Sequence, residues 1–434
     1  MTDPARRGAL SLLLRHEAEG GYANLLPDEG RLSRMPERER ALLIALFYGA
    51  VERRLTLDYA IGALSGRSAQ SLSPHTRAAL RLGLYQLYFM DIPPHAAVSE
   101  TVGLGEDPGE RGFLNAVLRA ATAGMPAPPP RERDTARHLS VAYSIPAPTV
   151  RYFLSRIGEE ETEALLRALN TRPPLFLRVN TLRTSREAFL TLLSKAGIPA
   201  ALDPLTRYGV RIEGAPPVRT LPGYREGLFF VQDAASQLAS EVLAPQKGDT
   251  VLDLCACPGG KSFGAALLSG DGARIISRDI HESKLPLIKA GADRLGLTSI
   301  TVEEWDATVS DPALYGKCDR VICDVPCSGL GVIAKKPDLR YRGVSSVGEL
   351  SALSASILDA AADALASGGT MVFSTCTLTR EENEDAVESL LARRGDLYTE
   401  PFSVGGLFAE DGMLTLWPHR HGTDGFFIAK IRRR

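Results

Sequence analysis

Apolar residues recur at helical spacing through about the first 124 positions of the chain. The clearest examples are "ALLIALFYGAVERRLTLDYAI" and "TRAALRLGLYQLYFM". The prolines of "DIPPH" (residues 91–95) are expected to end one helix before "AAVSETVGLG" begins the next. The pattern predicts an all-helical domain over residues 1–124. The proline-rich "GMPAPPPRER" (residues 124–133) then reads as a linker and a domain boundary.

A segment of mixed pattern follows, over residues 134–233. Helical "GEEETEALLRALN" precedes strand-like "PLFLRVNT", and helical "SREAFLTLLSKAG" precedes strand-like "GVRIEG". This order predicts a small α/β subdomain. The stretch "FFVQDAASQLASEVL" is expected to connect it through a helix to the last domain.

Strands alternate with helices in the last part of the chain, residues 234–434. The expected strands are "TVLDLCA", "ARIISRD", "ITVEEWD", "DRVICDVP", "GTMVFSTC" and "GFFIAKI", with helical runs such as "ESKLPLIKAGADRLG" and "LSALSASILDAAADALASG" between them. Such alternation predicts an α/β fold with a doubly wound, Rossmann-like parallel sheet. These sheets bind ligands at the carboxyl ends of their strands.

Composition narrows the class of protein. No run of 18 apolar residues occurs and the first residues lack a signal-peptide core, so we expect a cytoplasmic protein without a membrane partner. Six cysteines in 434 residues are expected to be free thiols. The net charge of −2 does not indicate a nucleic-acid binder. Arginine is nevertheless the only basic residue type, apart from histidine, before Lys195; this suits RNA phosphates, but arginine-rich codon usage explains it equally well.

The stretch "CACPGGKS" ends in the Gly-Lys-Ser of a phosphate-binding loop. That loop needs a glycine where this chain has Cys255, and Pro258 stiffens the turn, so we do not expect a nucleoside triphosphate. A strand, a tight turn and a helix suit instead a ligand that lies against the helix N-terminus. The residues of this turn are Cys255, Ala256, Cys257, Pro258, Gly259, Gly260 and Lys261.

Two acidic residues follow the next two expected strands. Asp279 is placed to accept hydrogen bonds from two ribose hydroxyls, and Asp306 from an adenine amino group. A single aspartate at a strand end is more often a helix cap. With Asp324 at the next strand end there are three acidic ends beside the glycine turn, which favours a ligand. An adenosine ligand without a pyrophosphate motif indicates S-adenosylmethionine as the cofactor.

The fourth and fifth of these strands each end next to a cysteine. "CDVPCSGLG" places Asp324 and Cys327 on one turn, and Cys376 follows "MVFST". Parallel neighbouring strands would bring Cys327 and Cys376 together. A metal site with Cys318 and Cys323 is disfavoured because the paired C-x-x-C spacing is missing, and these two cysteines are expected to be structural.

These motifs together resemble the NOL/NOP/Sun family of RNA cytosine-5 methyltransferases, most closely its bacterial branch that acts on 16S ribosomal RNA. The resemblance covers nearly the whole chain. It rests on "CACPGGK", "DVPCSGLG", "STCTLTREENE", "GTDGFFIAKI" and "FLRVNTLR", while "IPPHAAVSETVGLG" and "GFLNAVLRAA" are similar to a NusB-like RNA-binding domain. Cys257 stands where the family usually has alanine.

The resemblance implies a role for each residue of the expected site. Cys376 would add to cytosine C6, Asp324 would bind the base edge, and Cys327 would assist release. Lys261 would lie near the methionine end of the cofactor or near the base, and Asp324 would also border the cofactor. The helix expected from "TREENEDAVESLL" would stabilise the Cys376 thiolate through its N-terminal dipole, against the adjacent Glu381 and Glu382.

The resemblance implies 16S ribosomal RNA as the partner, free or in an assembling small subunit, with no obligate protein partner. The main rival interpretation within the enzyme class is another substrate, namely a different ribosomal RNA, a tRNA or protein-free DNA. In an arrangement like that of DNA cytosine-5 methyltransferases, Cys327 would be the nucleophile, but their other motifs are absent and "STCT" is present. An RNA-binding assembly factor would retain the fold without the chemistry, although every residue that the chemistry requires is present.

Overall fold

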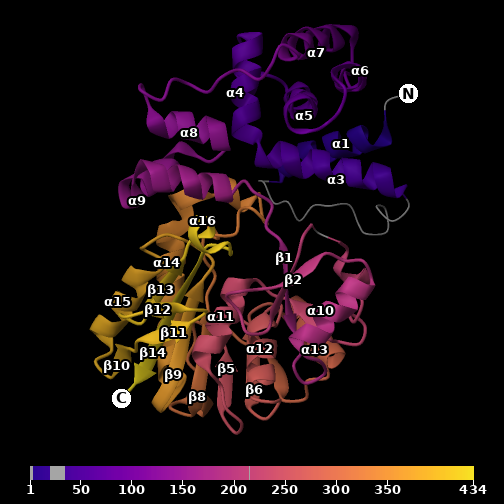
Figure 1. The fold of residues 1–434 in the computed structure, drawn as a ribbon. Coiled ribbons are helices and arrows are strands. Elements are labelled where there is room, and N and C mark those ends of the chain that lie inside the picture. The colour runs from indigo at the N-terminus through magenta and orange to yellow at the C-terminus, as the bar shows by residue number, and fades with distance from the viewer. Residues whose placement is uncertain (1–2, 20–34, 215) are drawn as a thin grey trace. The chain divides into compact units, whose positions relative to one another are not determined.

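The computed structural model describes residues 3–19, 35–214 and 216–434, and its contacts divide the chain into two compact units (Figure 1). Residues 1–170 and 333–344 form a helical unit, and residues 171–332 and 345–434 form a sheet unit. The predicted domains 1–124, 134–233 and 234–434 are not tested by this division and stay predictions. Positions 1–2 and 20–34 of the first lie outside the described residues.

The described part of residues 1–124 is helical, as predicted. The predicted stretch "ALLIALFYGAVERRLTLDYAI" divides into two helices at Arg53, and "DIPPH" separates two others as expected. Several helices begin on a serine or aspartate cap; Ser73 Oγ, for example, accepts the Thr76 amide at 3.1 Å. The helices are α1 (Pro4–Ala18), α3 (Glu37–Glu52), α4 (Arg54–Ser65), α5 (Pro74–Phe89), α6 (Pro94–Val102), α7 (Pro108–Ala121), α8 (Thr135–Tyr143) and α9 (Ala147–Ala168).

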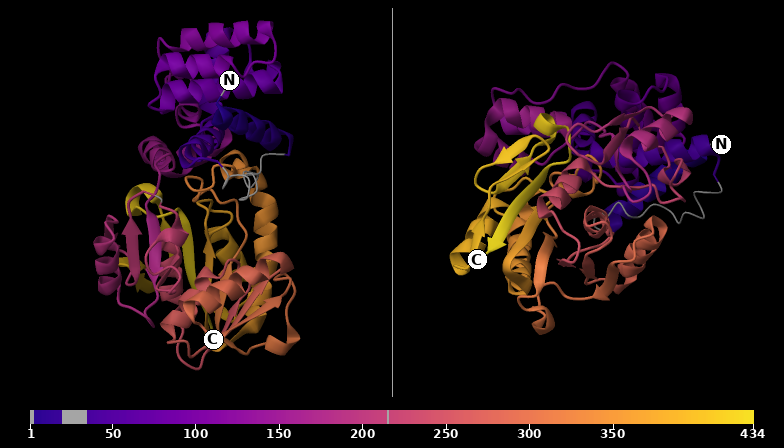
Figure 2. Two further views of the ribbon diagram at one scale, coloured as in Figure 1. Left: turned by 90° about the vertical axis from the view of Figure 1, so that its right-hand side faces the viewer. Right: turned by 60° about the horizontal axis from the view of Figure 1, so that its bottom comes forward.

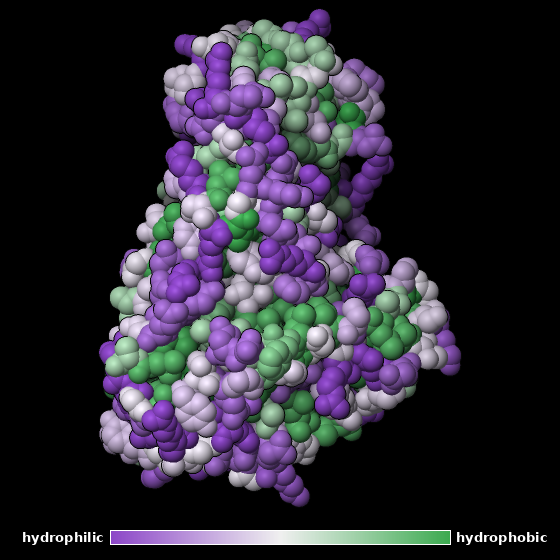
Figure 3. All heavy atoms as spheres, turned by 60° about the vertical axis from the view of Figure 1, so that its left-hand side comes forward, coloured by the Kyte–Doolittle hydropathy of each residue, from purple (hydrophilic) through white to green (hydrophobic). Residues whose placement is uncertain are grey.

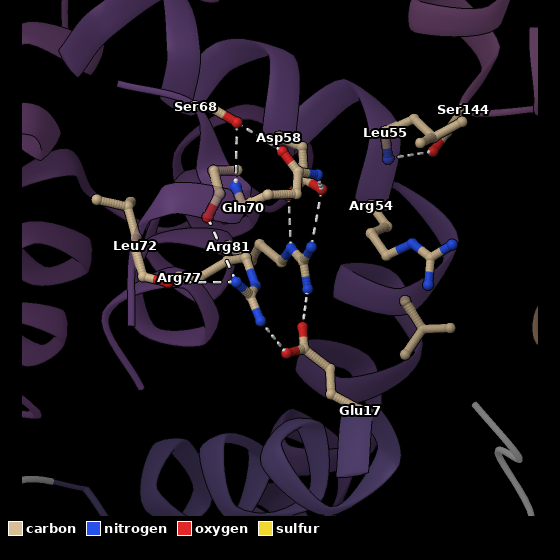
Figure 4. Close-up of polar contacts among 12 residues, drawn as sticks. Glu17, Arg54, Leu55, Asp58, Ser68, Gln70, Leu72, Arg77, Arg81 and Ser144 are labelled. Carbon is tan, nitrogen blue, oxygen red and sulfur yellow. Dashed lines mark hydrogen bonds and ion pairs between the residues drawn. The ribbon is translucent and has the colours of Figure 1, made fainter. Parts of the chain in front are cut away.

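A buried ion network holds α1, α4 and α5 together (Figure 4). The Arg81 guanidinium donates to both oxygens of Asp58, at 2.6 and 2.8 Å, and also to Glu17. Arg77 donates to the other Glu17 oxygen at 2.7 Å. The side chain of Arg81 is only 7% exposed, so its charge depends on these two carboxylates.

The first part of the sheet unit is a small antiparallel sheet. Its strands are β1 (Leu175–Val179), β2 (Ala200–Leu202), β3 (Gly209–Ile212) and β4 (Phe229–Val231), in the order β2-β3-β1-β4, with α10 (Arg186–Lys195) between β1 and β2. The predicted helix–strand–helix–strand order is confirmed. The strand β2 was not predicted. The stretch "FFVQDAASQLASEVL" leads to the last domain through a helix, as expected, and its first three residues pair with β1 as β4.

The main sheet has eight strands. Seven follow the order β10-β14-β9-β8-β5-β6-β7, and β13 also pairs with β14. All six predicted strands are among them. β9, β8, β5, β6 and β7 are parallel, whereas β14 pairs antiparallel with β9, which the prediction of a parallel sheet did not include. The strands are β5 (Thr250–Asp253), β6 (Arg274–Asp279), β7 (Ile300–Glu304), β8 (Cys318–Asp324), β9 (Leu365–Thr375), β10 (Leu397–Thr399), β13 (Met413–Leu416) and β14 (Phe426–Arg433), with a separate hairpin of β11 (Phe402–Val404) and β12 (Leu407–Ala409).

Helices cover both faces of this sheet, as the doubly wound fold requires (Figure 2). One buried cluster joins the strands to α11, α12 and α13, and another joins them to α14 and α15. These helices are α11 (Ala234–Leu243), α12 (Gly260–Leu268), α13 (Leu285–Leu295), α14 (Val347–Ala364) and α15 (Glu384–Arg393), and a short α16 (Pro418–His421) precedes β14. With both faces covered, the carboxyl edge of the strands is where polar side chains reach solvent.

The surface of the described residues is mixed in character. On the face drawn in Figure 3, hydrophilic side chains are interspersed with smaller hydrophobic patches. Among these residues, no helix combines the length and the hydropathy that crossing a bilayer requires.

We expect Arg81→Met to destabilise the helical unit. The substitution leaves Asp58 and Glu17 without their shared cation, which costs roughly 2–4 kcal/mol in buried networks. Urea unfolding followed by circular dichroism measures the loss. Arg393→Met is the matched control: Arg393 pairs with Asp359 across a surface where both side chains are more than a third exposed, so the control should cost less than about 1 kcal/mol. Equal losses in the two variants would contradict a special role for the network.

Candidate active site

Cys327 and Cys376 lie in contact at the carboxyl edge of the main sheet. β8 and β9 pair in parallel, with Asp324 beside Ser374, so the segments that follow both strands emerge at the same edge. The two Sγ atoms are 3.2 Å apart, and the Cys376 amide donates to Cys327 Sγ at 3.3 Å. The hydrogen bond with Cys376, together with burial, raises the pKa of Cys327 well above its ordinary value. Cys327 is therefore a thiol at neutral pH.

A buried carboxylate ties the two cysteine loops together. Glu382 accepts from the Ser328 amide at 2.7 Å and from Ser328 Oγ at 2.6 Å, and its second oxygen also accepts from Thr379 Oγ1 at 2.7 Å. Only 2% of Glu382 is exposed. The expectation that Glu382 faces the Cys376 thiol as an opposing charge was incomplete, since its carboxylate is committed to the loop that carries Cys327.

The helix expected from Thr379 onward begins later than predicted. α15 begins at Glu384, eight residues beyond Cys376, and the stretch before it is a loop. Asn383, wholly buried, donates to the Thr377 carbonyl at 3.2 Å and accepts from Thr375 Oγ1. The side chains of "EN" thus support the Cys376 turn instead of forming the first helical turn.

Two glycines close the site from one side. The Gly331 amide donates to the Cys376 carbonyl at 3.0 Å, and the Gly331 carbonyl accepts from the Gly425 amide at 2.9 Å. A Cβ atom on Gly331 would lie 1.9 Å from the Gly425 carbonyl oxygen. Glycine is therefore required for this approach of two backbones.

Lys261 and Asp324 form an ion pair close to the cysteines. Lys261 Nζ donates to Asp324 Oδ2 at 2.5 Å and to Ser236 Oγ at 2.9 Å, and it lies 5.2 Å from the centre of the Phe426 ring. Asp324 Oδ1 accepts from Ser374 Oγ at 2.7 Å. An ammonium group has three N–H donors, so one Lys261 proton remains for a further acceptor.

The predicted cofactor turn begins after β5 and ends at the N-terminus of α12. Gly259 has φ +108°, a conformation that side chains disfavour, and a Cβ there would meet the Phe263 ring at 2.3 Å. No side chain caps the first amides of α12. Behind the turn, Gln232 donates to the Gly260 carbonyl at 3.1 Å and accepts from the fully buried Arg178, whose pKa burial lowers to about 10. Arg178 lies in "FLRVNTLR" and was not predicted to belong to the site.

Asp279 and Asp306 lie where the strands end, with different local environments. Asp279 is the last residue of β6, and its two oxygens accept the amides of Cys257 at 3.2 Å and His281 at 3.0 Å. Asp306 lies two residues beyond β7 and caps a turn by accepting from the amide and hydroxyl of Thr308. The hydrogen bond from the Thr308 hydroxyl lowers the pKa of Asp306. Asp279 therefore joins the predicted cofactor turn directly, whereas Asp306 accepts its hydrogen bonds from Thr308 in its own turn.

Sequence reasoning missed Asp253, the last residue of β5. It is 1% exposed, and burial raises its pKa to about 7, against the opposing hydrogen bond from Ser262. Its Oδ2 accepts from Ser262 Oγ at 2.6 Å, while Oδ1 is buried without a partner. The signal that identified Asp279 and Asp324, an acid at the carboxyl end of a parallel strand, applies equally to Asp253.

The remaining cysteines are unsuited to chemistry as thiolates. Burial raises the pKa of Cys318 to about 11 and raises that of Cys255 and Cys323 further. In the described part of the chain, the one group of three potential ligands within 4.8 Å is His75, Glu106 and Glu110, so Cys318, Cys323 and Cys327 form no such group. A cavity of about 760 Å³ elsewhere in the sheet unit, lined by residues 202–208, 244–246 and 403–406, contains none of the predicted site residues.

Three family models match successive parts of the chain. They are the NusB family over residues 3–123, the ferredoxin-like domain of RsmF/B-like methyltransferases over residues 149–219, and the 16S rRNA methyltransferase RsmB/F family over residues 240–432. The helical and sheet-rich parts thus carry separate family signatures in the order that the sequence predicted.

Curated relatives match over nearly the full length. The probable ribosomal RNA small subunit methyltransferase B of Synechocystis sp. is 36% identical over 91% of each chain, and that of Bacillus subtilis is 34% identical over 98% of each. The ribosomal RNA small subunit methyltransferase B of Citrobacter koseri is 34% identical over 95% of this chain and 94% of its own.

Solved structures share the fold. The crystal structure of PH0851 has a TM-score of 0.81 at 25% identity and covers the whole of both chains. A methyltransferase homolog protein from Pyrococcus horikoshii has a TM-score of 0.60 at 25% identity, covering 69% of this chain and 99% of its own.

We expect the ionisation of the buried Asp253 carboxyl to lower the free energy of unfolding as pH rises. The pKa of this carboxyl is raised on folding, so the folded state holds the proton longer and the free energy of unfolding falls as pH rises from about 4 to about 7. Asp253→Asn removes this ionisation and should be more stable than the wild type above pH 7, by a few kcal/mol at most. Urea midpoints of both proteins at pH 4.5, 6 and 7.5 measure the difference. A constant difference across this range would contradict the burial of an ionisable Asp253.

We expect Glu382→Ala to release the loop of Cys327. The substitution leaves the buried Ser328 amide without an acceptor, at a cost of roughly 1–3 kcal/mol. Alkylation of Cys327 by iodoacetamide, followed by mass spectrometry of the peptide, should become several-fold faster. Glu381→Ala is the neighbouring control, since Glu381 is exposed. Unchanged alkylation in Glu382→Ala would show that the loop is held by other contacts.

Proposed function

Because the chain belongs to the RsmB/F family of 16S rRNA methyltransferases, we propose that it methylates C5 of a cytosine in 16S ribosomal RNA with S-adenosylmethionine. The proposal includes a covalent adduct between Cys376 and cytosine C6. The observation that carries it is the contact of two thiols, 3.2 Å apart, on the turns that follow neighbouring strands, beside the Lys261–Asp324 ion pair. Methylation of an amino or hydroxyl group needs no such pair of thiols.

The cofactor turn fits a cationic adenosine ligand. Asp279 is held by two backbone amides, yet each of its oxygens retains a lone pair for a ribose hydroxyl. The partnerless Oδ1 of Asp253 and the uncapped amides of α12 are the unsatisfied polar groups that a ligand at this turn would approach. The backbone of residues 255–261 would hold the ligand, with Asp306 near the adenine and Asp324 at the reactive end. When bound, S-adenosylmethionine supplies an electrophilic methyl group.

Lys261 and Asp324 orient the base. The free proton of the Lys261 ammonium suits a ring acceptor of cytosine, and an oxygen of Asp324 suits the exocyclic amino group. Ser236 and Ser374 hold the two charged groups in place from α11 and β9. A positive charge at the base edge favours electron flow toward N3 when a nucleophile adds at C6.

Cys376 and Cys327 have different roles in the reaction: Cys376 forms the covalent bond and Cys327 assists its cleavage. Cytosine C5 is a poor nucleophile until the Cys376 sulfur bonds to C6 and the ring electrons shift toward N3 and C5. After C5 gains the methyl group, its proton leaves to a base, the C5–C6 double bond returns and the S–C6 bond breaks. Because its pKa is raised, Cys327 keeps its proton and donates a hydrogen bond to the departing sulfur of Cys376.

The helical unit recruits the RNA. Its NusB match and its exposed arginines support this role, since guanidinium groups bind phosphates independently of sequence. These exposed residues are Arg7, Arg15, Arg38, Arg67, Arg111, Arg119, Arg133, Arg137, Arg151, Arg167 and Arg342. The target base must leave its stack to reach a thiol, so binding energy has to come from elsewhere on the RNA.

We expect the two cysteine variants to fail at different steps. Cys376→Ala cannot form the adduct and should lose activity by on the order of a thousandfold or more. Cys327→Ala should still attack and methylate but stall before release, so an RNA–protein adduct should persist on a denaturing gel. The assay uses 16S rRNA, radiolabelled S-adenosylmethionine and mapping of 5-methylcytosine in the product.

Cys318→Ala serves as the control, because Cys318 is a buried cysteine at the opposite end of β8. Cys318→Ala should methylate the RNA and accumulate no adduct. The Cys327→Ala/Cys376→Ala double variant should neither methylate the RNA nor form an adduct. An adduct in Cys376→Ala that is absent from Cys327→Ala would reverse the roles. Label in rRNA at a position other than cytosine C5 would refute the proposed reaction.

A further inference from the structure

Residues 333–344 belong to the helical unit, although in the sequence they interrupt the sheet unit. The chain therefore passes between the units three times, after residues 170, 332 and 344. The segment follows the Cys327 loop and precedes α14. We call residues 339–341 of this segment, a single 3₁₀ turn, the anchor turn.

Tyr341 of the anchor turn completes the junction between α3 and α4. Its hydroxyl lies 2.8 Å from the Val51 carbonyl and 2.9 Å from the Glu52 carbonyl, which end α3, and it accepts the Arg54 amide, which begins α4, at 3.1 Å. Helix ends leave such groups unsatisfied unless another part of the chain supplies a partner. The phenol supplies partners to both ends at once.

The side chain of Arg54 also lies against Tyr341. Its guanidinium carbon is 3.7 Å from the ring centre, a cation–π contact. In Figure 4 this guanidinium lies apart from the Arg81 network, with no dashed line to Asp58 or Glu17, while the next residue, Leu55, donates its amide to Ser144 at 3.0 Å. The aromatic ring of the anchor turn is thus a principal neighbour of the Arg54 cation.

Arg340 binds the ends of two more helices. Its Nη1 donates to the Tyr143 carbonyl, which ends α8, and to Asn170 Oδ1, both at 3.0 Å, and Nη2 donates to the Leu169 carbonyl after α9 at 3.1 Å. Arg340 is wholly buried, and its nearest carboxylate oxygen, on Glu52, is 3.8 Å away. The negative ends of helix dipoles therefore supply much of its compensation.

The stretches of chain on both sides of residues 333–344 contact the loops or strands that carry the cysteines. On one side, Gly331 is bonded to the Cys376 carbonyl and to Gly425, two residues before the segment starts. On the other side, α14 begins three residues after the segment ends and packs with Cys323 and Phe373 of the cysteine-bearing strands. The anchor turn is thus connected through short stretches of chain to both elements that position Cys327 and Cys376.

We propose that Arg340 and Tyr341 are positioning residues that couple RNA held by the helical unit to the cysteine pair. The inference rests on the proposed function. Displacement of the anchor turn leaves each unit able to act separately but loosens the relation between the bound RNA and the two thiols. Methylation should therefore depend on the anchor turn when the substrate is a large RNA, which reaches both units. It should not depend on the anchor turn when the substrate is a small RNA, which reaches the thiols alone.

Tyr341→Phe and Arg340→Lys test this in the full-length protein. Tyr341→Phe removes the hydroxyl and keeps the ring, and Arg340→Lys removes the guanidinium fork and keeps the positive charge. The substrates are intact 16S rRNA and a short stem-loop cut around the cytosine that wild-type protein methylates. We expect kcat/KM for 16S rRNA to fall about five- to tenfold, as for the loss of one or two hydrogen bonds. The value for the stem-loop should stay within about twofold, assayed below the unfolding midpoint of each variant.

Tyr315→Phe and Arg393→Lys are the matched controls, since both side chains are exposed on the sheet unit. Equal losses on both RNAs, or no loss on either, would overturn the inference and leave the proposed function intact. Wild-type protein that labels neither RNA would overturn the proposed function and the inference with it.

A second measurement needs no variant. Hydrogen exchange of the wild-type protein should slow in residues 328–332 and in residues 339–341 together when intact 16S rRNA is added without cofactor. Protection that appears in the exposed helices of the helical unit but in neither of these stretches would overturn the coupling.

Discussion

The parallel pairing of β8 with β9 is the constraint on which the rest of the site depends. Parallel neighbours end at the same edge, so Asp324 and Ser374 lie side by side and the turns that follow bring two sulfur atoms within 3.2 Å. Each further contact then refines this placement. Glu382 and Asn383 hold the two turns, Ser374 holds Asp324, and Asp324 holds Lys261. None of these bonds would form if the strands ran in opposite directions.

Buried charges in the two units are compensated in different ways. In the helical unit, Arg81 lies between two carboxylates, and Arg340 donates through both Nη atoms to helix-end carbonyls. At the sheet edge, Asp253 keeps one oxygen without a partner, and its carboxyl is hard to ionise. Polar groups that stay unsatisfied without a ligand are typical of functional sites, where local stability is lower than packing alone would allow.

The sequence predicted the elements whose signal is local. Apolar runs located six of the eight strands of the main sheet, and β10 and β13 were missed. The direction of β14 was missed because an apolar run carries no information about its pairing partner. α15 begins late because Glu382 and Asn383 instead satisfy buried groups, Glu382 in the Cys327 loop and Asn383 in the Cys376 turn. The place of residues 333–344 was missed because "IAKKPDLRYRGV" is polar and irregular, which is typical of a surface loop, and its contacts are non-local.

Because the helical unit is built from two separate stretches of the chain, it cannot be completed as soon as its first stretch is synthesised. Tyr341 bonds to Arg54, 287 positions earlier in the chain, so the N-terminal helices are made long before the residues that complete them. A nascent chain carries α3, α4, α8 and α9 with unsatisfied ends until most of the sheet unit has left the ribosome. Contacts of such sequence separation form slowly. Folding of this protein is therefore not a simple succession from the N-terminal domain onward, and the part synthesised first is among the last to be finished.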